Sequence, residues 1–335
     1  MTAATDTAVE TKRLNYLAAI REAQIEEMER DESVILLGED CEVGVFGTTD
    51  KLDEQFGTNR VRTTPVSENG FAGAGIGAAM TGLRPIIDLT IAAFVYVSMD
   101  QLVSQAAKNR YMFGGQARIP IVFRAAMLYG GNAGAHHSDR PYPLFMNTPG
   151  LKVAVPASPA DAKGLLKTAV RDDNPIMFFE DQTLWSQREE VPTSSEFLIP
   201  FGQAAVKREG SDVTLVAIAG SVPRALKAAK LLERDGISVE VIDPRTLVPL
   251  DWDTILASVE KTGRLVVADP AHLSCSAASE ILATVAERAF SSLRVPPLRV
   301  TTPDMNVPFA PSMLVGFYPD PDRIAAGVRK VVDHG

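Results

Sequence analysis

One carboxylate, Glu68, stands where acid–base chemistry is feasible. It lies in the segment PVSENG, just before a run of small residues. In one interpretation Ser67 or Glu68 caps the N-terminus of a helix, because serine and acidic residues are favoured there. In the other, an apolar wall of Val66, Phe71 and Ile76 holds a carboxylate that shares a proton with a ligand nitrogen. Caps are common, so these residues alone favour the capping interpretation.

Two of the four histidines, His136 and His137, are adjacent in the glycine-rich segment 130–145. Adjacent histidines point in different directions, and no HxxxH, HxH or cysteine completes a metal site nearby. Proton donation or hydrogen bonding by one of them is therefore favoured over metal binding. A polar surface loop without a role is an equally good interpretation of this segment.

A third segment, RDDNP at 171–175, follows an expected helix. It is either an ordinary turn, rich in Asp, Asn and Pro, or a cage of backbone carbonyls for a monovalent cation. The residues leave both interpretations open.

Alternating strands and helices must position these groups. Apolar runs that end at Gly, Pro or acidic residues predict strands at 34–40, 85–91, 120–125, 151–156 and 176–180. Helical periodicity is expected at 14–28, 69–81, 99–111 and 160–171. This alternation predicts an α/β fold with a mainly parallel sheet covered on both faces. The histidine segment follows a strand, so it is expected at the carboxyl edge of the sheet, where ligands bind.

A second α/β unit follows. Strands are expected at 212–220, 237–247 and 264–269, and helices at 222–234, 277–289 and 322–332. The polar segment 186–200, with two prolines, is typical of a linker. We therefore divide the chain into a flexible N-terminus (1–10), a larger domain (11–185), this linker and a smaller domain (201–335).

Composition excludes several classes of protein. The formal net charge of −9 makes duplex nucleic acid an improbable partner. Two cysteines, Cys41 and Cys275, cannot build a disulfide framework or a four-cysteine zinc site. No secretory signal and no apolar run of membrane-spanning length occur, so a cytoplasmic protein is expected. The glycine pattern at 73–78 lacks a preceding buried strand, which favours a closely packed helix over dinucleotide binding.

Several segments, in order, carry a resemblance to a known family. They include LLGED, TTPVSENGFAGAGIGAAMTGLRPI, DQLVSQAAKNRYMFGGQARIPIVFR, HHS, NTPGLKV, DAKGLLKTAVRDDNPIMFFE, EVIDPRTLVPLD and PDMNVPFAP. From about residue 14 to 332 the chain resembles the beta subunit of thiamine diphosphate-dependent 2-oxo acid dehydrogenases. The resemblance implies two parallel-sheet α/β domains, a transketolase-like pyrimidine-binding domain and a transketolase C-terminal domain.

The resemblance also implies roles for single residues. Glu68 matches the glutamate that hydrogen-bonds a ring nitrogen of the cofactor's aminopyrimidine, and Phe94 matches the aromatic residue that stacks on that ring. Val66 and Thr90 match neighbouring cofactor contacts. His137 matches the histidine that assists proton transfer as the acyl group passes to a lipoyl arm.

Metal sites and partners are implied in the same way. Backbone carbonyls match a potassium site that supports the loop near the cofactor; they belong to Ile121, Ala169, Val170, Asp172 and Asn174. The family's Gly-Asp-Gly motif, which holds the diphosphate through magnesium, is missing from this chain. The resemblance thus implies an alpha subunit that carries the magnesium, a cofactor shared between subunits, and an assembly of two alpha and two beta chains.

Departures from the family pattern bear on the substrate. Ala93 stands where an acid or Asn is frequent, and Asp139 where Gln is frequent. The leading hypothesis is decarboxylation of pyruvate or a branched-chain 2-oxo acid, with acyl transfer to lipoamide and docking of a lipoyl acyltransferase component. A two-subunit carboligase or acetoin-cleaving enzyme outside a lipoyl complex is the alternative. A non-catalytic binding scaffold is a third hypothesis.

Overall fold

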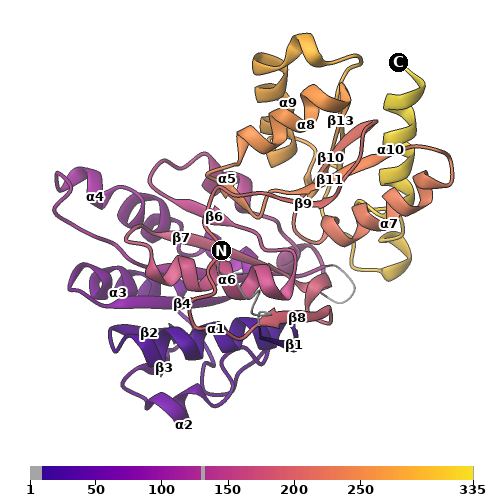
Figure 1. The fold of residues 1–335 in the computed structure, drawn as a ribbon. Helices are drawn as coiled ribbons and strands as arrows, with labels where there is room; N and C mark the ends of the chain where they lie inside the picture. Colours follow the sequence, from indigo (N-terminus) through magenta and orange to yellow (C-terminus); the bar gives the residue numbers. More distant parts are fainter. Residues whose placement is uncertain (1–9, 130–132, 335) are drawn as a thin grey trace, which may run out of the picture.

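The computed structural model describes residues 10–129 and 133–334. The expected flexible N-terminus, apart from its last residue, and the start of the glycine-rich segment lie outside these ranges. Figure 1 shows two α/β units, an N-terminal one in indigo to magenta and a C-terminal one in orange to yellow. The predicted α/β fold class is confirmed.

The first unit is built on a seven-stranded sheet. Its strands, in spatial order, are β12 (Thr246–Val248), β6 (Lys152–Ala154), β7 (Ile176–Asp181), β5 (Val122–Met127), β4 (Arg84–Ile91), β2 (Val34–Gly38) and β3 (Val61–Thr63). All neighbours are parallel except β12, which pairs with β6 in the antiparallel direction. The predicted strands are therefore present, and the sheet is mainly parallel as expected.

Both faces of this sheet are covered, because successive residues of each strand enter different apolar clusters. Leu36 and Ile86 pack with α1 (Tyr16–Arg30) and α6 (Pro159–Arg171) on one face. Leu37 and Ile87, one residue further along, pack with residues of α3 and of the segments after β4 on the other. The remaining elements of this unit are α2 (Leu52–Phe56), α3 (Glu68–Met80), η1 (Ala92–Tyr96), η2 (Asp100–Ala106), α4 (Asn109–Met112), η3 (Ala135–His137), α5 (Tyr142–Met146) and η4 (Gln182–Leu184).

Helix α3 lies unusually close to the sheet, and Gly75 is the reason. A Cβ atom at Gly75 would lie 2.4 Å from Cδ1 of Ile87 on β4, so a side chain there would overlap the side chain of Ile87. The interpretation of the glycine pattern as a closely packed helix is thus confirmed. The element directly before α3 is the short strand β3, followed by a loop. The helix therefore does not follow a buried strand as the first helix of a dinucleotide-binding unit does.

The second unit has a five-stranded sheet in the order β14-β13-β10-β11-β9. Helices α7 and α10 pack on one face and α8 and α9 on the other. The bounds are β9 (Ala205–Arg208), β10 (Val213–Ala217), α7 (Ser221–Glu233), β11 (Val239–Asp243), α8 (Trp252–Thr262), β13 (Leu265–His272), α9 (Ala277–Arg288), η5 (Phe290–Ser292), β14 (Leu298–Thr302), η6 (Pro311–Met313) and α10 (Pro321–Asp333).

Three details differ from the sequence-based expectations. The segment expected to be a linker contains β8 (Arg188–Pro192), which pairs with β1 (Thr11–Asn15). The strand expected at 237–247 is two strands, because Arg245 adopts a left-handed conformation and turns the chain from β11 into β12. The helix expected at 99–111 is a π-helical turn, η2, followed by the short helix α4. Across the described ranges, no helix has the length and apolar character needed to cross a membrane.

Candidate active site

The candidate site lies where neighbouring parallel strands of the first sheet end. Gly38, the last residue of β2, pairs with Thr63 of β3 and with Asp88 of β4. The residues that follow these positions, Glu39 and Thr64, therefore lie at one edge of the sheet. Because ligands of open α/β sheets bind at the carboxyl ends of strands, this edge is the expected location of a site.

Glu68 is the first residue of α3 and faces this edge. Its residue surface is only 7% exposed, and among the described residues no group donates a hydrogen bond to its carboxylate. Ser67 precedes the helix without a side-chain capping bond. The capping interpretation favoured by the residue types is thus wrong for Ser67, and Glu68 remains as a largely buried acidic residue at the start of the helix.

A second carboxylate, Glu39, lies beside Glu68, and sequence reasoning missed it as a site residue. Burial and then the nearby charge of Glu68 raise the pKa of Glu39, while the backbone N–H of Ser67 opposes this by donating to its carboxylate. Its Oε1 atom is buried without a hydrogen-bond partner. The signal was present in the sequence, since LLGED ends a buried strand directly in an acidic residue.

Thr90, at the end of β4, has an unusual backbone. Its φ angle is +59°, and its N–H donates to Oδ1 of Asp88 at 2.9 Å. Its hydroxyl Oγ1 and that of Thr64 are buried without partners. Left-handed conformations of β-branched residues are strained and concentrate at functional sites.

The two aromatic groups predicted for the site meet directly. Phe94 in η1, which follows β4, and His137 in η3, which follows β5, have ring centroids 5.3 Å apart at an interplanar angle of 79°. The Nδ1 atoms of His136 and His137 lie 3.1 Å apart, within hydrogen-bonding distance. Nowhere in the described ranges do three His, Cys, Asp or Glu side chains gather as a metal site requires.

A buried ion network underlies this edge. Arg124 on β5 donates to Glu180 at 2.7 Å, to Gln24 at 3.0 Å and to Asp88 at 3.3 Å. Asp88 in turn accepts from the N–H of Thr90. The network therefore fixes the strand that leads into Thr90 and Phe94.

The unpartnered atoms test whether a heteroaromatic cofactor fits. Buried polar atoms without partners are rare, and clusters of them indicate a missing ligand. Glu39, Thr64 and Thr90 contribute such atoms, Glu68 contributes a free carboxylate, and Phe94 contributes an aromatic face. These residues fit an aminopyrimidine, which carries ring nitrogens and an amino group. Val66, also expected at the site, is 80% exposed and covers nothing within this chain.

The predicted potassium carbonyls lie at the other edge of the sheet. Asp172 and Asn174 precede β7, and Ile121 precedes β5, so these carbonyls are at the amino ends of strands. The length of six-residue β5, about 20 Å, separates them from the histidine side. The expectation that they support the loop near the cofactor is thus not met. Nη1 of Arg84 donates to the carbonyls of Val170 and Asp172 at 3.0 and 3.1 Å, so these two oxygens converge on one cation.

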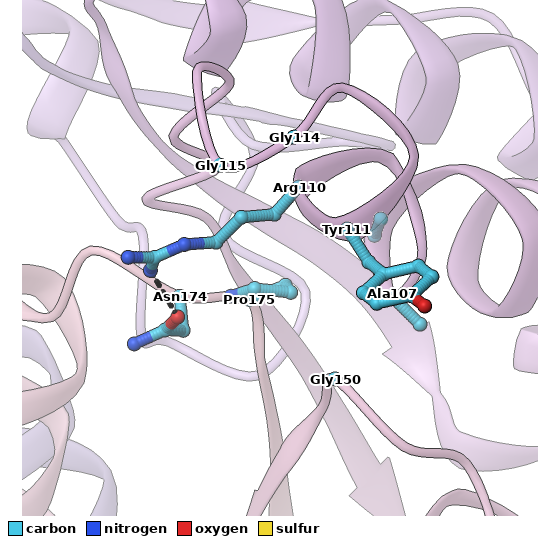
Figure 2. Close-up of a pocket in the computed structure, with 9 residues that line it drawn as sticks. Ala107, Arg110, Tyr111, Gly114, Gly115, Gly150, Asn174 and Pro175 are labelled. Atoms are coloured by element: carbon cyan, nitrogen blue, oxygen red, sulfur yellow. Dashed lines mark hydrogen bonds between the residues drawn. The ribbon is translucent and has the colours of Figure 1, made fainter.

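A cavity of about 480 Å³ lies at this amino edge. Figure 2 shows the Arg110 side chain beside Asn174 and Pro175, with Tyr111 on the opposite side. Nη1 of Arg110 donates to Oδ1 of Asn174 at 2.6 Å. Tyr111 is 91% exposed. The cavity is therefore separate from the site around Glu68.

Comparisons with known proteins agree with this geometry. Residues 12–186 match the transketolase pyrimidine-binding domain and residues 202–324 the transketolase C-terminal domain. The chain is 45% identical to the beta subunit of a Bacillus subtilis (strain 168) acetoin:2,6-dichlorophenolindophenol oxidoreductase, over 92% of this chain and 94% of that protein. It is 42% identical to the 2-oxoisovalerate dehydrogenase beta subunit of the same strain, over 96% and 99%. It is 40% identical to that strain's pyruvate dehydrogenase E1 component beta subunit, over 96% and 99%.

The fold is also shared with a solved structure described as a split gene transketolase, an inactive beta4 tetramer. That chain superposes with a TM-score of 0.77 at 22% identity, covering 94% of this chain and 97% of the other. At this identity the likeness establishes the fold alone.

Proposed function

Because the chain belongs to the family of beta subunits of thiamine diphosphate-dependent 2-oxo acid dehydrogenases, we propose that it works with an alpha subunit to decarboxylate pyruvate or a branched-chain 2-oxo acid and to transfer the acyl group to lipoamide. One observation carries the proposal. Glu68, a residue only 7% exposed, lies at the same sheet edge as the Phe94–His137 ring pair.

Thiamine diphosphate, when bound, supplies a thiazolium carbon that adds to the 2-oxo carbon and a ring that accepts the electron pair as carbon dioxide leaves. Glu68 is positioned to hold and move a proton at a ring nitrogen of the aminopyrimidine. Phe94 offers the face on which the pyrimidine ring stacks, while Val66 and Thr90 line it.

His137 serves the transfer step. As the disulfide of the lipoyl dithiolane opens, one sulfur takes the acyl group and the other takes a proton. We assign the donation of that proton to His137, whose neighbour His136 is at hydrogen-bonding distance. The edge-on contact with Phe94 keeps the imidazole near the stacked ring.

An alpha subunit completes the proposed site. Val66, Val97 and Tyr96 are 80%, 57% and 45% exposed, and all lie close in sequence to predicted cofactor contacts. Exposed apolar residues around a site are typical of a surface that a partner covers. The alpha subunit would also hold the magnesium ion and the diphosphate, and two alpha and two beta chains would assemble.

The potassium site stays part of the proposal. The carbonyls of Val170 and Asp172 already converge on the Arg84 cation, and each oxygen keeps a second lone pair. A potassium ion there would order the turn before β7 rather than the loop beside Glu68.

A second candidate function is acetoin cleavage by a two-subunit enzyme of the same family. The observation that favours it is sequence identity, which is 45% to two acetoin oxidoreductase beta subunits and 40–42% to the 2-oxo acid dehydrogenase beta subunits. Both functions use the same roles for Glu68 and Phe94, so they differ in substrate rather than in cofactor chemistry.

The experiment is a substrate panel on the co-purified alpha–beta assembly. Pyruvate, three branched-chain 2-oxo acids and acetoin are each tested with thiamine diphosphate, magnesium and an artificial electron acceptor, and then with a lipoyl domain as the acceptor. Turnover of a 2-oxo acid with lipoyl acylation supports the main proposal. Turnover of acetoin without turnover of any 2-oxo acid supports the second candidate function instead. An assembly that binds the cofactor but turns over nothing would leave the scaffold hypothesis standing.

A further inference from the structure

A buried arginine, Arg140, lies three residues after His137 and is not explained by the proposed chemistry. It is only 7% exposed, and its Nε and Nη2 atoms are buried without hydrogen-bond partners. Its Nη1 atom donates to the carbonyl of Ser138, the residue next to His137. The guanidinium is thus attached to the η3 segment that carries the histidine.

The same guanidinium lies against two tyrosine rings from different units of the fold. Its Cζ atom is 3.8 Å from the ring centroid of Tyr129, which follows β5, and 4.8 Å from that of Tyr318, which precedes α10. The two rings also contact each other, with centroids 4.6 Å apart. A cation over two aromatic faces is held by cation–π attraction, which is strongest when water is excluded.

Tyr129 is itself fixed. Its hydroxyl donates to Oδ2 of Asp181 at 2.7 Å, and the N–H of Gly220, just before α7, donates to the same oxygen at 3.0 Å. The ring under Arg140 is therefore held by groups from both sheets. The histidine segment is connected through Arg140 to the junction of the two units.

A second contact holds the other end of the segment. Burial and then the nearby charge of Asp139 raise the pKa of Tyr96, so the residue before Arg140 lies beside η1, where Phe94 lies. Asp139 and Arg140 thus hold the segment between η1 and the C-terminal unit.

We propose that Arg140 is a positioning residue, which fixes the η3 segment against Tyr129 and Tyr318 and so places the His137 ring for proton donation in acyl transfer. The inference rests on the proposed function of His137. A guanidinium with unpartnered nitrogens is costly to bury, which indicates that its place in the fold serves more than stability.

The test separates the two half-reactions of the alpha–beta assembly. In R140M the rate of lipoyl-domain acylation is expected to fall by about tenfold to a hundredfold, because small displacements of a catalytic group have effects of this size. The rate with an artificial acceptor, which bypasses acyl transfer to the lipoyl arm, should change little, and so should KM for the 2-oxo acid. R140K is expected to recover part of the acylation rate, because an ammonium group can still donate to Ser138 and lie over the rings. If R140M does not assemble, the ratio of the lipoyl-domain acylation rate to the artificial-acceptor rate is measured in R140K instead.

R224M is the matched control. The Arg224 guanidinium lies 5.1 Å from the same Tyr129 ring, but it donates to the carbonyl of Pro319 and not to the η3 segment. R224M should keep the ratio of the two rates within about twofold of wild type. The double variant H137A/R140M should be no slower in acylation than H137A alone, because the two residues act through one group.

Three results would overturn this inference without touching the proposed function. They are equal ratios of acylation rate to artificial-acceptor rate in R140M and R224M, equal loss of both half-reactions in R140M, and additive effects in the double variant. A wild-type assembly with no turnover of any substrate in the panel would instead overturn the proposed function, and this inference with it.

Discussion

The imidazole of His137 meets the ring of Phe94 edge-on, at a centroid distance of 5.3 Å. The two residues are 43 positions apart and follow different strands, β4 and β5, which pair in parallel in the sheet. Their contact joins the group proposed to stack on the cofactor with the group proposed to donate a proton. The predictions below start from this arrangement.

Replacing the Glu68 carboxyl by an amide should nearly abolish turnover. In E68Q of the alpha–beta assembly, kcat is expected to fall by about 10²- to 10⁴-fold, the usual contribution of a positioned acid–base group. The circular dichroism spectrum and assembly should stay unchanged, because Gln keeps the side-chain shape. The control is E54Q on the exposed surface of α2, which should keep wild-type kcat. Wild-type turnover in E68Q would remove Glu68 from its role.

The isolated chain should bind thiamine diphosphate weakly. It offers the pyrimidine contacts but no magnesium motif, so the diphosphate has no metal to hold it. Titration calorimetry should show affinity rising by at least about a hundredfold when alpha subunit and magnesium are both present, a difference near 2.7 kcal/mol. Equally tight binding to the chain alone would contradict the shared site.

Potassium should stabilise the chain through the turn before β7. When the free potassium concentration is 100 times the dissociation constant, binding of the ion adds about 2.7 kcal/mol to the free energy of unfolding. The thermal midpoint is therefore expected to fall when potassium chloride is replaced by choline chloride at equal ionic strength, with sodium chloride giving a smaller loss. Equal midpoints in the three salts would refute the site.

Asp243 gives a pH-dependent prediction. Burial and then the charge of Asp161 raise the pKa of Asp243 to about 7, against an ordinary value of 3.8. Because the folded-state pKa is the higher one, the protonated carboxyl favours folding. Its contribution is complete below about pH 3.8 and is lost as the pH rises through 7.

The measurement compares wild type with D243N between pH 5 and pH 8 by denaturant unfolding. The wild-type free energy of unfolding should decline relative to that of D243N, by at most about 1.4 kcal/mol for each pH unit below the folded pKa. D253N, at an exposed position of α8, should follow wild type. A difference that stays constant with pH would show that Asp243 does not titrate in this range.

Local patterns were sufficient to predict much of the site. The sequence pattern placed Glu68 at the start of a helix and the histidines after a strand, and the small residues of α3 predicted its close packing against a neighbouring element. These features follow from side-chain periodicity within single elements, which the sequence displays directly.

Features that depend on contacts between distant segments were not predictable. The sequence shows Glu39 as an acidic residue after a buried strand, but it does not show that Glu68 lies beside it. Arg140 becomes notable only because its guanidinium lies against the ring of Tyr318. Likewise, the pairing of β8 with β1 depends on register between residues that are 173 to 181 positions apart, from Asn15↔Arg188 to Thr11↔Pro192. No local pattern encodes such a register.

Strand β12 has a consequence for dividing the chain. It follows residue 200 in the sequence but borders β6 in the first sheet, so the C-terminal half shields a strand edge of the N-terminal half. A fragment that stops before residue 201 would expose the unpaired backbone groups of β6 to other molecules, which is the condition that promotes aggregation. Expression of the two halves as separate polypeptides should therefore succeed only when both are made together, so that the second half can supply its strand to the first.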